Sequence, residues 1–176
     1  MINFKQFHIR SISSKDIEIL GDLYFPWSTR EETVSKWTRY FDEHQRGIRK
    51  AQIAFYQDGI VGYGHLLFHS EYPEFKNNHI PEIQDVWVYE GNRNKGIGTA
   101  LIRHFETLAA EDGYKQLGIG VGLYRDYGFA QRLYARLGFV PDGCGITYKY
   151  SPAIAGEQYP VDDDLLLWLT KRIEAK

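Results

Sequence analysis

The segment Arg93-Asn94-Lys95-Gly96-Ile97-Gly98 stands between a strand-like run, residues 83–89, and a helix-like run, residues 99–105. A glycine-rich turn that opens a helix leaves several backbone N–H groups unpaired, and the positive end of the helix dipole lies beside them. Such a turn binds phosphate through the backbone rather than through side chains. The segment therefore predicts a phosphate-binding loop.

Two common phosphate-binding loops do not fit these residues. A P-loop carries Lys and then Ser or Thr after its last glycine, whereas Ile97 and Gly98 follow Gly96 here. A dinucleotide-binding loop needs a third glycine at the position that Leu101 occupies. The sequence therefore indicates neither nucleotide hydrolysis nor dinucleotide binding.

The bulk composition narrows the class of protein. A chain of 176 residues is long enough for one domain with a substantial core, and its net charge of −2 argues against a nucleic-acid binder. No apolar run approaches the length of a membrane span, and residues 1–6 lack the apolar centre of a signal peptide. Cys144 is the single cysteine, so we expect no internal disulfide and a reducing, cytoplasmic location. We expect Cys144 itself to be a small buried residue rather than a nucleophile.

Hydrophobic periodicity and turn signals predict the order of the elements. Strands are expected at residues 7–12, 51–56, 60–68, 80–89, 116–121, 145–150 and 165–173, with residues 70–78 as a loop. Helices are expected after Ser13, after a capping box at residues 28–31, after Gly96, and at residues 126–137. In the last of these helices Phe129, Leu133 and Leu137 are spaced by four and predict the core stripe.

Two motifs carry a resemblance to a known family. Arg93-x-x-Gly96-x-Gly98 resembles the R/Q-x-x-G-x-G/A loop of the GNAT superfamily of N-acetyltransferases, and residues 133–139 resemble its L-Y-x-x-x-G-F signature. The element order is similar over nearly the whole chain, most closely from Glu82 to Gly143. The resemblance implies a single domain over residues 1–176 with a mixed α/β fold. The sheet would be mostly antiparallel, with its fourth and fifth strands parallel and splayed, and about four helices would flank it.

The resemblance also implies the reaction. A member of this family would take the acetyl group of acetyl-CoA, its co-substrate, and transfer it to a primary amine by direct attack in a ternary complex, without a metal. Tyr134 would then be the general acid that protonates the departing thiolate, whose pKa as a thiol is about 8.5. The alternative for Tyr134 is a packing role only.

The acceptor must lose a proton before it attacks. An alkyl ammonium has a pKa near ~10.4, so its deprotonation at pH 7 costs about 4 kcal/mol without help from a base. Glu82 matches the position of the catalytic glutamate in the histone-acetylating branch of the family. Asp85 is the second candidate, and strict alternation would place it on the opposite strand face. A remote base or a chain of water molecules also stays open.

The resemblance assigns the co-substrate site to three parts of the chain. The main chain of residues 86–88 would bind the thioester and the pantetheine arm, the loop would bind the pyrophosphate, and Tyr127 stands where the family often has asparagine. The predicted residues are Val86, Trp87, Val88, Arg93, Asn94, Lys95, Gly96, Ile97, Gly98, Thr99, Tyr127 and Tyr134. The alternating glycines at 118, 120 and 122 indicate either a close approach by this ligand or a flexible strand.

The acceptor itself is less clearly indicated. Candidates are Trp27, Glu31, Glu32, Trp37, Tyr40, the loop Glu71–Lys76 and Tyr148, all of which also have ordinary structural interpretations. We expect a small-molecule amine. The alternatives are a protein lysine or N-terminus, or a non-catalytic acyl-CoA-binding module. The apolar run Leu165–Leu169 adds the hypothesis of a homodimer, because both faces of that strand would be hydrophobic.

Overall fold

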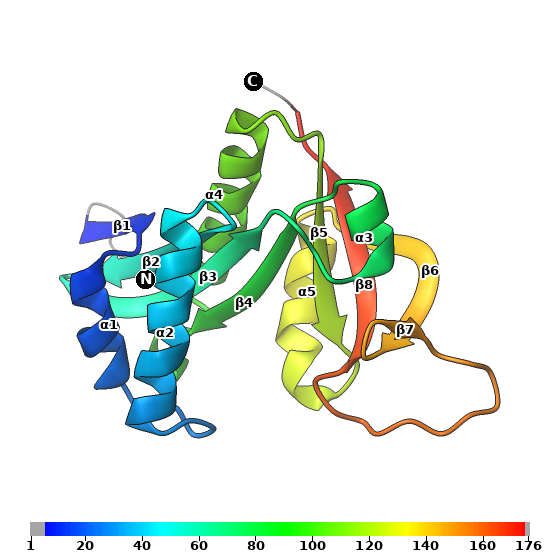
Figure 1. Cartoon of the computed structure of the whole chain (residues 1–176), viewed down its shortest axis with the longest axis horizontal. Helices are drawn as coiled ribbons and strands as arrows, with labels where there is room; N and C mark the ends of the chain where they lie inside the picture. The colour runs from blue at the N-terminus through cyan, green and yellow to red at the C-terminus, as the bar shows by residue number, and fades with distance from the viewer. Residues whose placement is uncertain (1–5, 175–176) are drawn as a thin grey trace.

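A computed structural model describes residues 6–174 of the chain, and its central feature is an eight-stranded sheet (Figure 1). The strand order is β1-β2-β3-β4-β5-β8-β6-β7, in which β4 and β5 are the parallel pair and the other neighbours are antiparallel. The mixed α/β fold that the sequence predicts is therefore confirmed.

The elements follow the predicted order with two short additions, a helix at Pro73–Asn77 and a strand at Ser151–Pro152. The strands are β1 (Phe7–Ser11), β2 (Arg49–Tyr56), β3 (Gly59–Leu67), β4 (Glu82–Val88), β5 (Gln116–Gly122), β6 (Val140–Tyr148), β7 (Ser151–Pro152) and β8 (Leu165–Arg172). The helices are α1 (Ser14–Gly21), α2 (Arg30–Gln45), α3 (Pro73–Asn77), α4 (Ile97–Glu111) and α5 (Gly128–Arg136). Single 3-10 turns, η2 (Glu90–Asn92) and η3 (Arg125–Tyr127), precede α4 and α5. None of the helices within residues 6–174 has the length and apolarity needed to cross a bilayer.

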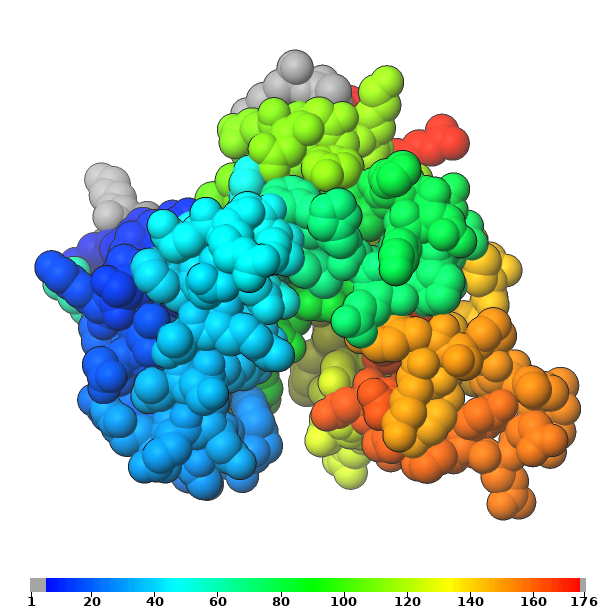
Figure 2. All heavy atoms as spheres, viewed as in Figure 1, coloured from blue at the N-terminus to red at the C-terminus, as the bar shows by residue number. Residues whose placement is uncertain are grey.

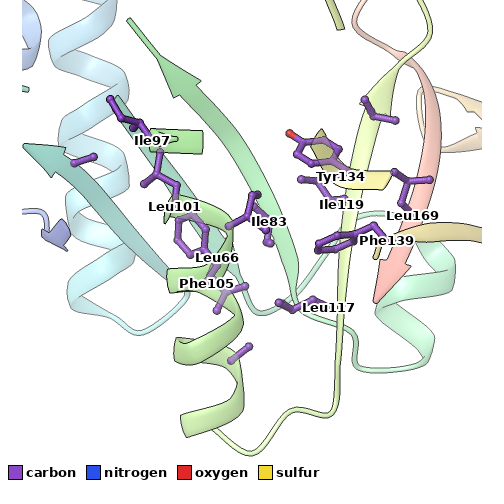
Figure 3. Close-up of a cluster of buried hydrophobic side chains, with 14 of the residues drawn as sticks. Leu66, Ile83, Ile97, Leu101, Phe105, Leu117, Ile119, Tyr134, Phe139 and Leu169 are labelled. Atoms are coloured by element: carbon purple, nitrogen blue, oxygen red, sulfur yellow. The ribbon is translucent and has the colours of Figure 1, made fainter. Parts of the chain in front are cut away.

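Helices cover both faces of the sheet. On one face α4 and α5 bury a cluster that includes Leu101, Phe105 and Tyr134, of which Figure 3 shows the centre. On the other face α1 and α2 pack on β2 and β3 through Trp37 and Tyr40, and α3 packs farther along the sheet. Burying each large apolar side chain contributes roughly 1.5–3 kcal/mol, so these clusters hold the layers together.

Three local expectations need correction. Residues 73–77 of the predicted loop form α3, because Pro73 stands at a first-turn position and Phe75 is fully buried. The capping box of α2 uses Thr29 and Glu32, one residue later than expected. Phe129 is 73% exposed rather than part of a core stripe, while Tyr134 of the same helix is buried.

Cys144 also differs from its expectation, because it is a free, exposed cysteine. It lies in a β6 segment where the register with β8 shifts between Pro141 and Ile146. This irregular stretch leaves the side chain outside the core, although cysteine is commonly buried.

β4 and β5 separate soon after they begin. Their pairing consists of Glu82 with Gly118 and Ile83 with Ile119, after which the two strands diverge (Figure 1). β5 remains paired with β8 along its whole length, and β4 remains paired with β3. The splayed parallel pair is thus confirmed, and its inner edges offer backbone groups that no neighbouring strand takes.

A β-bulge in β4 overturns the prediction for Asp85. The register with β3 shifts between Tyr63 and His65, and Asp85 has a left-handed φ of 50°. A bulge inserts one residue and resets the alternation of side chains. Asp85 therefore lies on the same face as Glu82, toward α2, while Val86 returns to the α4 face.

The glycine face of β5 is filled by the protein's own aromatic rings. A Cβ atom at Gly118 would lie 2.1 Å from the ring of Phe75, and one at Gly122 would lie 2.4 Å from the ring of Tyr127. A Cβ atom at Gly120 would lie 2.9 Å from the ring of Trp168. The alternating glycines are therefore explained by close ring packing, which neither sequence interpretation included.

The apolar run on β8 has an explanation within the chain. Trp168 packs with Phe75 and Tyr72 on one face of the sheet, and Leu169 joins the α4–α5 cluster on the other. The hypothesis of a homodimer thus loses this argument and stays a prediction.

Candidate active site

The glycine-rich loop has the backbone conformation of an anion-binding turn. Gly96 is the N-cap of α4 and is left-handed, with a φ of 89°, and Asn94 is left-handed as well. The first helical hydrogen bond runs from the N–H of Ala100 to the carbonyl of Gly96 at 3.0 Å. The N–H groups of Ile97, Gly98 and Thr99 have no intrahelical acceptor, so they are available to an anion.

The two cations of this loop contact the backbone of the residues just before it. The Nε of Arg93 donates to the carbonyl of Val88 at 3.1 Å, and its guanidinium lies 4.7 Å from the ring centroid of Trp87. The Nζ of Lys95 donates to the carbonyl of Gly91 at 2.6 Å. Both charges therefore lie at the loop, where they favour a negative ligand.

The free edge of β4 faces the gap toward β5. The N–H of Tyr89 donates to the carbonyl of Val61 on β3, so the backbone groups of Tyr89 point to β3. Backbone direction alternates along a strand, and Val88 therefore presents its N–H and carbonyl to the gap. The contact of Arg93 with the Val88 carbonyl agrees with this direction. Val86, two residues earlier, presents its backbone to the same side.

Tyr134 lies between the two diverging strands. Its side chain is 6% exposed and packs with Phe139 and Ile119, while its hydroxyl points to the side on which β4 lies (Figure 3). Burial raises the pKa of its phenol above the ordinary value. Tyr134 therefore keeps its proton at neutral pH and is available as a hydrogen-bond donor at the gap.

Tyr127 is held at the end of β5 that borders the gap. Its ring covers Gly122, and its hydroxyl donates to Asp163 at 2.9 Å. Tyr124 donates to the same carboxylate oxygen and packs edge-on against the Tyr127 ring. Burial and the hydrogen bond to Asp163 raise the pKa of Tyr127. The phenol oxygen is thus already committed to Asp163, which leaves its aromatic face for other contacts.

Glu82 is a buried carboxyl group at the point where β4 and β5 part. Its side chain accepts hydrogen bonds from the Oγ of Ser70 at 2.5 Å and from the Nε2 of Gln84 at 2.9 Å. Burial raises its pKa, and these two hydrogen bonds only partly offset that effect. A carboxyl group whose pKa is raised is a stronger base when ionised than an ordinary surface glutamate.

Asp85 has a different environment on the same strand. Its carboxylate forms an ion pair with Lys36 at 2.9 Å, accepts a hydrogen bond from Tyr40 at 3.0 Å, and is 40% exposed. Desolvation by the packing of α2 would raise its pKa, but the charge of Lys36 and the hydrogen bonds from Lys36 and Tyr40 outweigh this effect and lower the pKa. Asp85 is therefore stabilised as a carboxylate and is a weaker base than Glu82.

The open side of the site lies between α2 and the β6–β7 region. Figure 2 shows the molecule hollowed between the blue-to-cyan α1–α2 side and the orange segment that follows β6. A groove of about 530 Å³ runs along α2 and is lined by Glu31, Glu32, Ser35, Lys36 and Arg39. Lys36 of this lining is ion-paired with Asp85, so one side of the groove borders β4.

The structure separates the acceptor candidates by role. Trp37 and Tyr40 are buried in the α2 core, although the Tyr40 hydroxyl reaches Asp85. Glu32 is occupied by the capping box of α2, while Trp27 is 55% exposed beside Trp87. Tyr148 donates to Asp162. Within residues 6–174, no group of three His, Cys, Asp or Glu side chains could hold a metal ion.

Three residues at the site have no signal in the sequence. Lys36 and Arg39 are ordinary polar residues of an amphipathic helix, and only the α2–β4 packing brings Lys36 to Asp85, while Arg39 lies over the ring of Tyr40. Tyr150 stands in the tight β6–β7 turn, and the charges of Glu82 and Glu71 reach its phenol. A capping box and a hairpin signal locate the elements but do not show which side chains converge between them.

The chain matches the model of the family described as Acetyltransferase (GNAT) family over residues 17–139, which is more than half of its length. The chain belongs to the GNAT acetyltransferase family. It is therefore an acetyl-CoA-dependent transferase. No curated protein sequence matches the chain.

Solved structures of this GNAT fold match almost the whole chain. RimL, a ribosomal α-N-protein acetyltransferase in complex with coenzyme A, is 17% identical with a TM-score of 0.72, and 97% of this chain and 96% of that chain are covered. The spermidine N-acetyltransferase of Vibrio cholerae, with CoA and spermine, is 14% identical with a TM-score of 0.66 and 96% coverage of both chains. The yncA protein of Salmonella typhimurium, a putative acetyltransferase solved with acetyl-CoA, is 15% identical with a TM-score of 0.67. The match covers 97% of this chain and 96% of that chain. At these identities the likeness shows the fold.

The residues of the site fit acetyl-CoA as the co-substrate. The unpaired N–H groups at the start of α4 suit a pyrophosphate, and the free backbone of Val88 suits the amide groups of an extended pantetheine arm. Tyr134 lies beside the same gap with its proton retained. These groups would hold the ligand so that its thioester carbonyl is open to attack from the α2 side.

Proposed function

We propose that this GNAT enzyme acetylates a primary amine of a small molecule by direct attack in a ternary complex, within a single domain over residues 1–176. The observation that carries the proposal is the parting of β4 and β5 beside two complementary groups. Glu82 is a buried base at the start of the gap, and Tyr134 is a buried proton donor beside it. Acetyl transfer to an amine needs one group of each kind.

The proposed chemistry assigns one role to each residue. Glu82 takes the proton of the acceptor ammonium, directly or through water, and the neutral nitrogen forms the new bond to the acetyl carbonyl carbon. The N–H of Val86 donates a hydrogen bond to the carbonyl oxygen as negative charge develops there. The carbon–sulfur bond breaks as the Tyr134 hydroxyl protonates the departing thiolate, and the second proton that the nitrogen loses as the amide forms returns to Tyr134, directly or through water. Asp85 is left out as the base because Lys36 and Tyr40 hold it ionised.

Acetylation of a protein N-terminus is the second candidate. Two observations favour it: the groove along α2 is open rather than closed, and RimL, which has the same fold, is an α-N-protein acetyltransferase. A panel that contains both small amines and short peptides separates the two candidates. We expect the small amines to give the higher kcat/KM.

The test is thiol release from acetyl-CoA by the whole chain, compared with its Tyr134→Phe variant. The variant keeps the buried ring and loses only the hydroxyl, so kcat should fall by about 10²-fold or more while the Kd for acetyl-CoA stays within about twofold. Tyr114→Phe is the matched control, because that ring stacks on Phe68 at the start of β5, at the opposite end from Gly122.

Two outcomes contradict the proposal. Unchanged turnover in Tyr134→Phe removes this residue from the chemistry. Tight binding of acetyl-CoA with no thiol release on any amine or peptide identifies the chain as a non-catalytic acyl-CoA-binding module.

A further inference from the structure

Every second residue of β5 turns its backbone to the gap. The N–H of Gly118 donates to the carbonyl of Pro81 at 2.9 Å, just before β4 begins, so the backbone of Gly118 points away from β8. Backbone direction alternates along a strand, and β5 pairs with β8 without a register shift. The backbone groups of Gly120 and Gly122 therefore point to the gap as well, opposite the free edge of β4.

Gln131 of α5 reaches this edge of β5. Its Nε2 donates to the carbonyl of Gly122 at 2.7 Å, in a partly buried hydrogen bond. β4 and β5 part after Ile83 and Ile119, and Gly122 lies three residues beyond that point. Val86 lies three residues beyond it on β4, so the two residues are at a similar depth of the gap. The side chain of Gln131 therefore stands beside the part of the gap in which the pantetheine arm would lie.

The carboxamide of Gln131 has hydrogen-bonding capacity that the protein does not use. A carbonyl can only accept, so the nitrogen of the carboxamide faces Gly122 and its oxygen points away. Among residues 6–174, this Oε1 has no hydrogen-bond partner, and it is not enclosed in the core. Gln131 thus occupies one acceptor of the β5 edge and presents another, Oε1, farther from the strand.

The two tyrosines nearest to Gln131 on the same helix face have other roles. Tyr127, Gln131 and Tyr134 are spaced by four and then three residues, so their side chains share one face. The hydroxyl of Tyr127 is committed to Asp163, and Tyr134 is the proton donor of the proposed reaction. Gln131 is therefore the residue of this face whose amide is still free to bind a ligand in the gap.

On this basis we propose that Gln131 binds the pantetheine arm of acetyl-CoA, with its Oε1 accepting a hydrogen bond from an amide N–H of the arm. An extended arm that bonds to β4 along one edge turns its other edge to β5. A side chain held on the Gly122 carbonyl extends the edge of β5 toward such an arm. This inference rests on the position of acetyl-CoA in the proposed function and does not depend on the class of the acceptor.

Calorimetric titration of the whole chain with two ligands tests this contact. Acetyl-CoA has the pantetheine arm, whereas 3′-phospho-ADP has the adenosine and the pyrophosphate of CoA without the arm. Gln131→Lys keeps a donor for the Gly122 carbonyl and removes the acceptor, while Gln131→Met removes both. In each variant the ratio of the Kd for acetyl-CoA to the Kd for 3′-phospho-ADP should rise about threefold to tenfold, because one hydrogen bond to the arm is lost. The ratio also cancels any effect of the new lysine charge on the phosphates.

Gln57→Met is the matched control, because its amide bonds to Gln6 at 3.1 Å beside the β2–β3 turn, and its ratio should equal that of the wild type. An unchanged ratio in Gln131→Lys shows that Gln131 only anchors Gly122 and overturns the inference, while the proposed function stands. An equal rise of both Kd values gives Gln131 a structural role and overturns the inference as well. If Gln131→Met does not fold, Gln131→Lys decides. If the wild type does not bind acetyl-CoA, the inference and the proposed function fail together, whereas binding without turnover on any amine overturns the proposed function alone.

Discussion

Replacing Glu82 by glutamine keeps the shape of the buried carboxyl group and removes its ability to take a proton. The amide can keep both neighbours, since its oxygen can accept from Gln84 and its nitrogen can donate to Ser70. The Oγ of Ser70 already accepts from the N–H of Tyr72 at 3.0 Å and has a second lone pair. The fold should therefore tolerate the change, which a thermal unfolding midpoint close to that of the wild type would verify.

The expected loss of activity follows from the acceptor's own pKa. At pH 7 an alkylamine with a pKa near ~10.4 is neutral in roughly one molecule in ~10³, and a positioned base recovers about 10²–10⁴ of rate. Glu82→Gln should lower kcat/KM at pH 7 by about the same factor. The deficit should shrink by about tenfold per pH unit as the solvent itself deprotonates the amine.

Ser70→Ala tests the same residue from its hydrogen-bond partner. The 2.5 Å bond from Ser70 stabilises the ionised form of Glu82 and lowers its pKa relative to burial alone. A hydrogen bond to a charged group contributes about 1.5–3 kcal/mol, which corresponds to about one to two pKa units. The acidic limb of the kcat/KM profile should therefore move to higher pH by that amount in Ser70→Ala, with the plateau preserved.

The assay is the pH dependence of thiol release from about pH 5 to 10 for the wild type and the two variants. Glu82 loses its proton as the pH rises through its pKa, so the wild-type rate should rise and then level off. In Glu82→Gln the rate should keep rising toward the pKa of the amine. A Glu82→Gln profile that still levels off at the wild-type pH would refute Glu82 as the base, and an unmoved limb in Ser70→Ala would refute its link to Ser70.

Two further predictions concern packing around the gap. Gly118→Ala should destabilise the fold by about 1–3 kcal/mol, because the new Cβ would lie 2.1 Å from the ring of Phe75. Chemical denaturation measures this loss, and a smaller loss in the background of Phe75→Leu is expected if the ring is the cause. Asp163→Ala should weaken acetyl-CoA binding about twofold to tenfold, because Tyr127 and Tyr124 lose their shared acceptor. Calorimetric titration with acetyl-CoA measures it, and an unchanged Kd would show that this carboxylate does not orient Tyr127 for the ligand.

Much of the fold could be predicted because its signals are local. The loop at Gly96 combines a required left-handed turn with a helix start, and the hairpin after Tyr56 turns through two left-handed residues, Gln57 and Asp58. Strand alternation and helical spacing located most elements to within a few residues. These features depend on backbone sterics and short-range hydrogen bonds, which neighbouring residues specify.

The candidate site was predicted in part for the same reason. Val88 and the loop follow each other closely in sequence, so a motif can place them together. Tyr134 comes 46 positions after Val88 in the printed sequence and was placed by the resemblance rather than by any local rule. Which of Glu82 and Asp85 is the better base could not be decided from spacing, because both are acids on one strand.

From the sequence by itself came a phosphate-binding turn that only a few residue types allow, and the resemblance of two motifs to the GNAT superfamily added the co-substrate class. Only the tertiary structure decided how the acceptor side is built. The bulge at Asp85 depends on the register of β4 against β3, and the ion pair between Asp85 and Lys36 depends on how α2 packs against β4. The rings over Gly118 and Gly122 come from elements far apart in the chain. Long-range packing sets the direction of these side chains, and for that reason no local pattern in the sequence shows which of them meet.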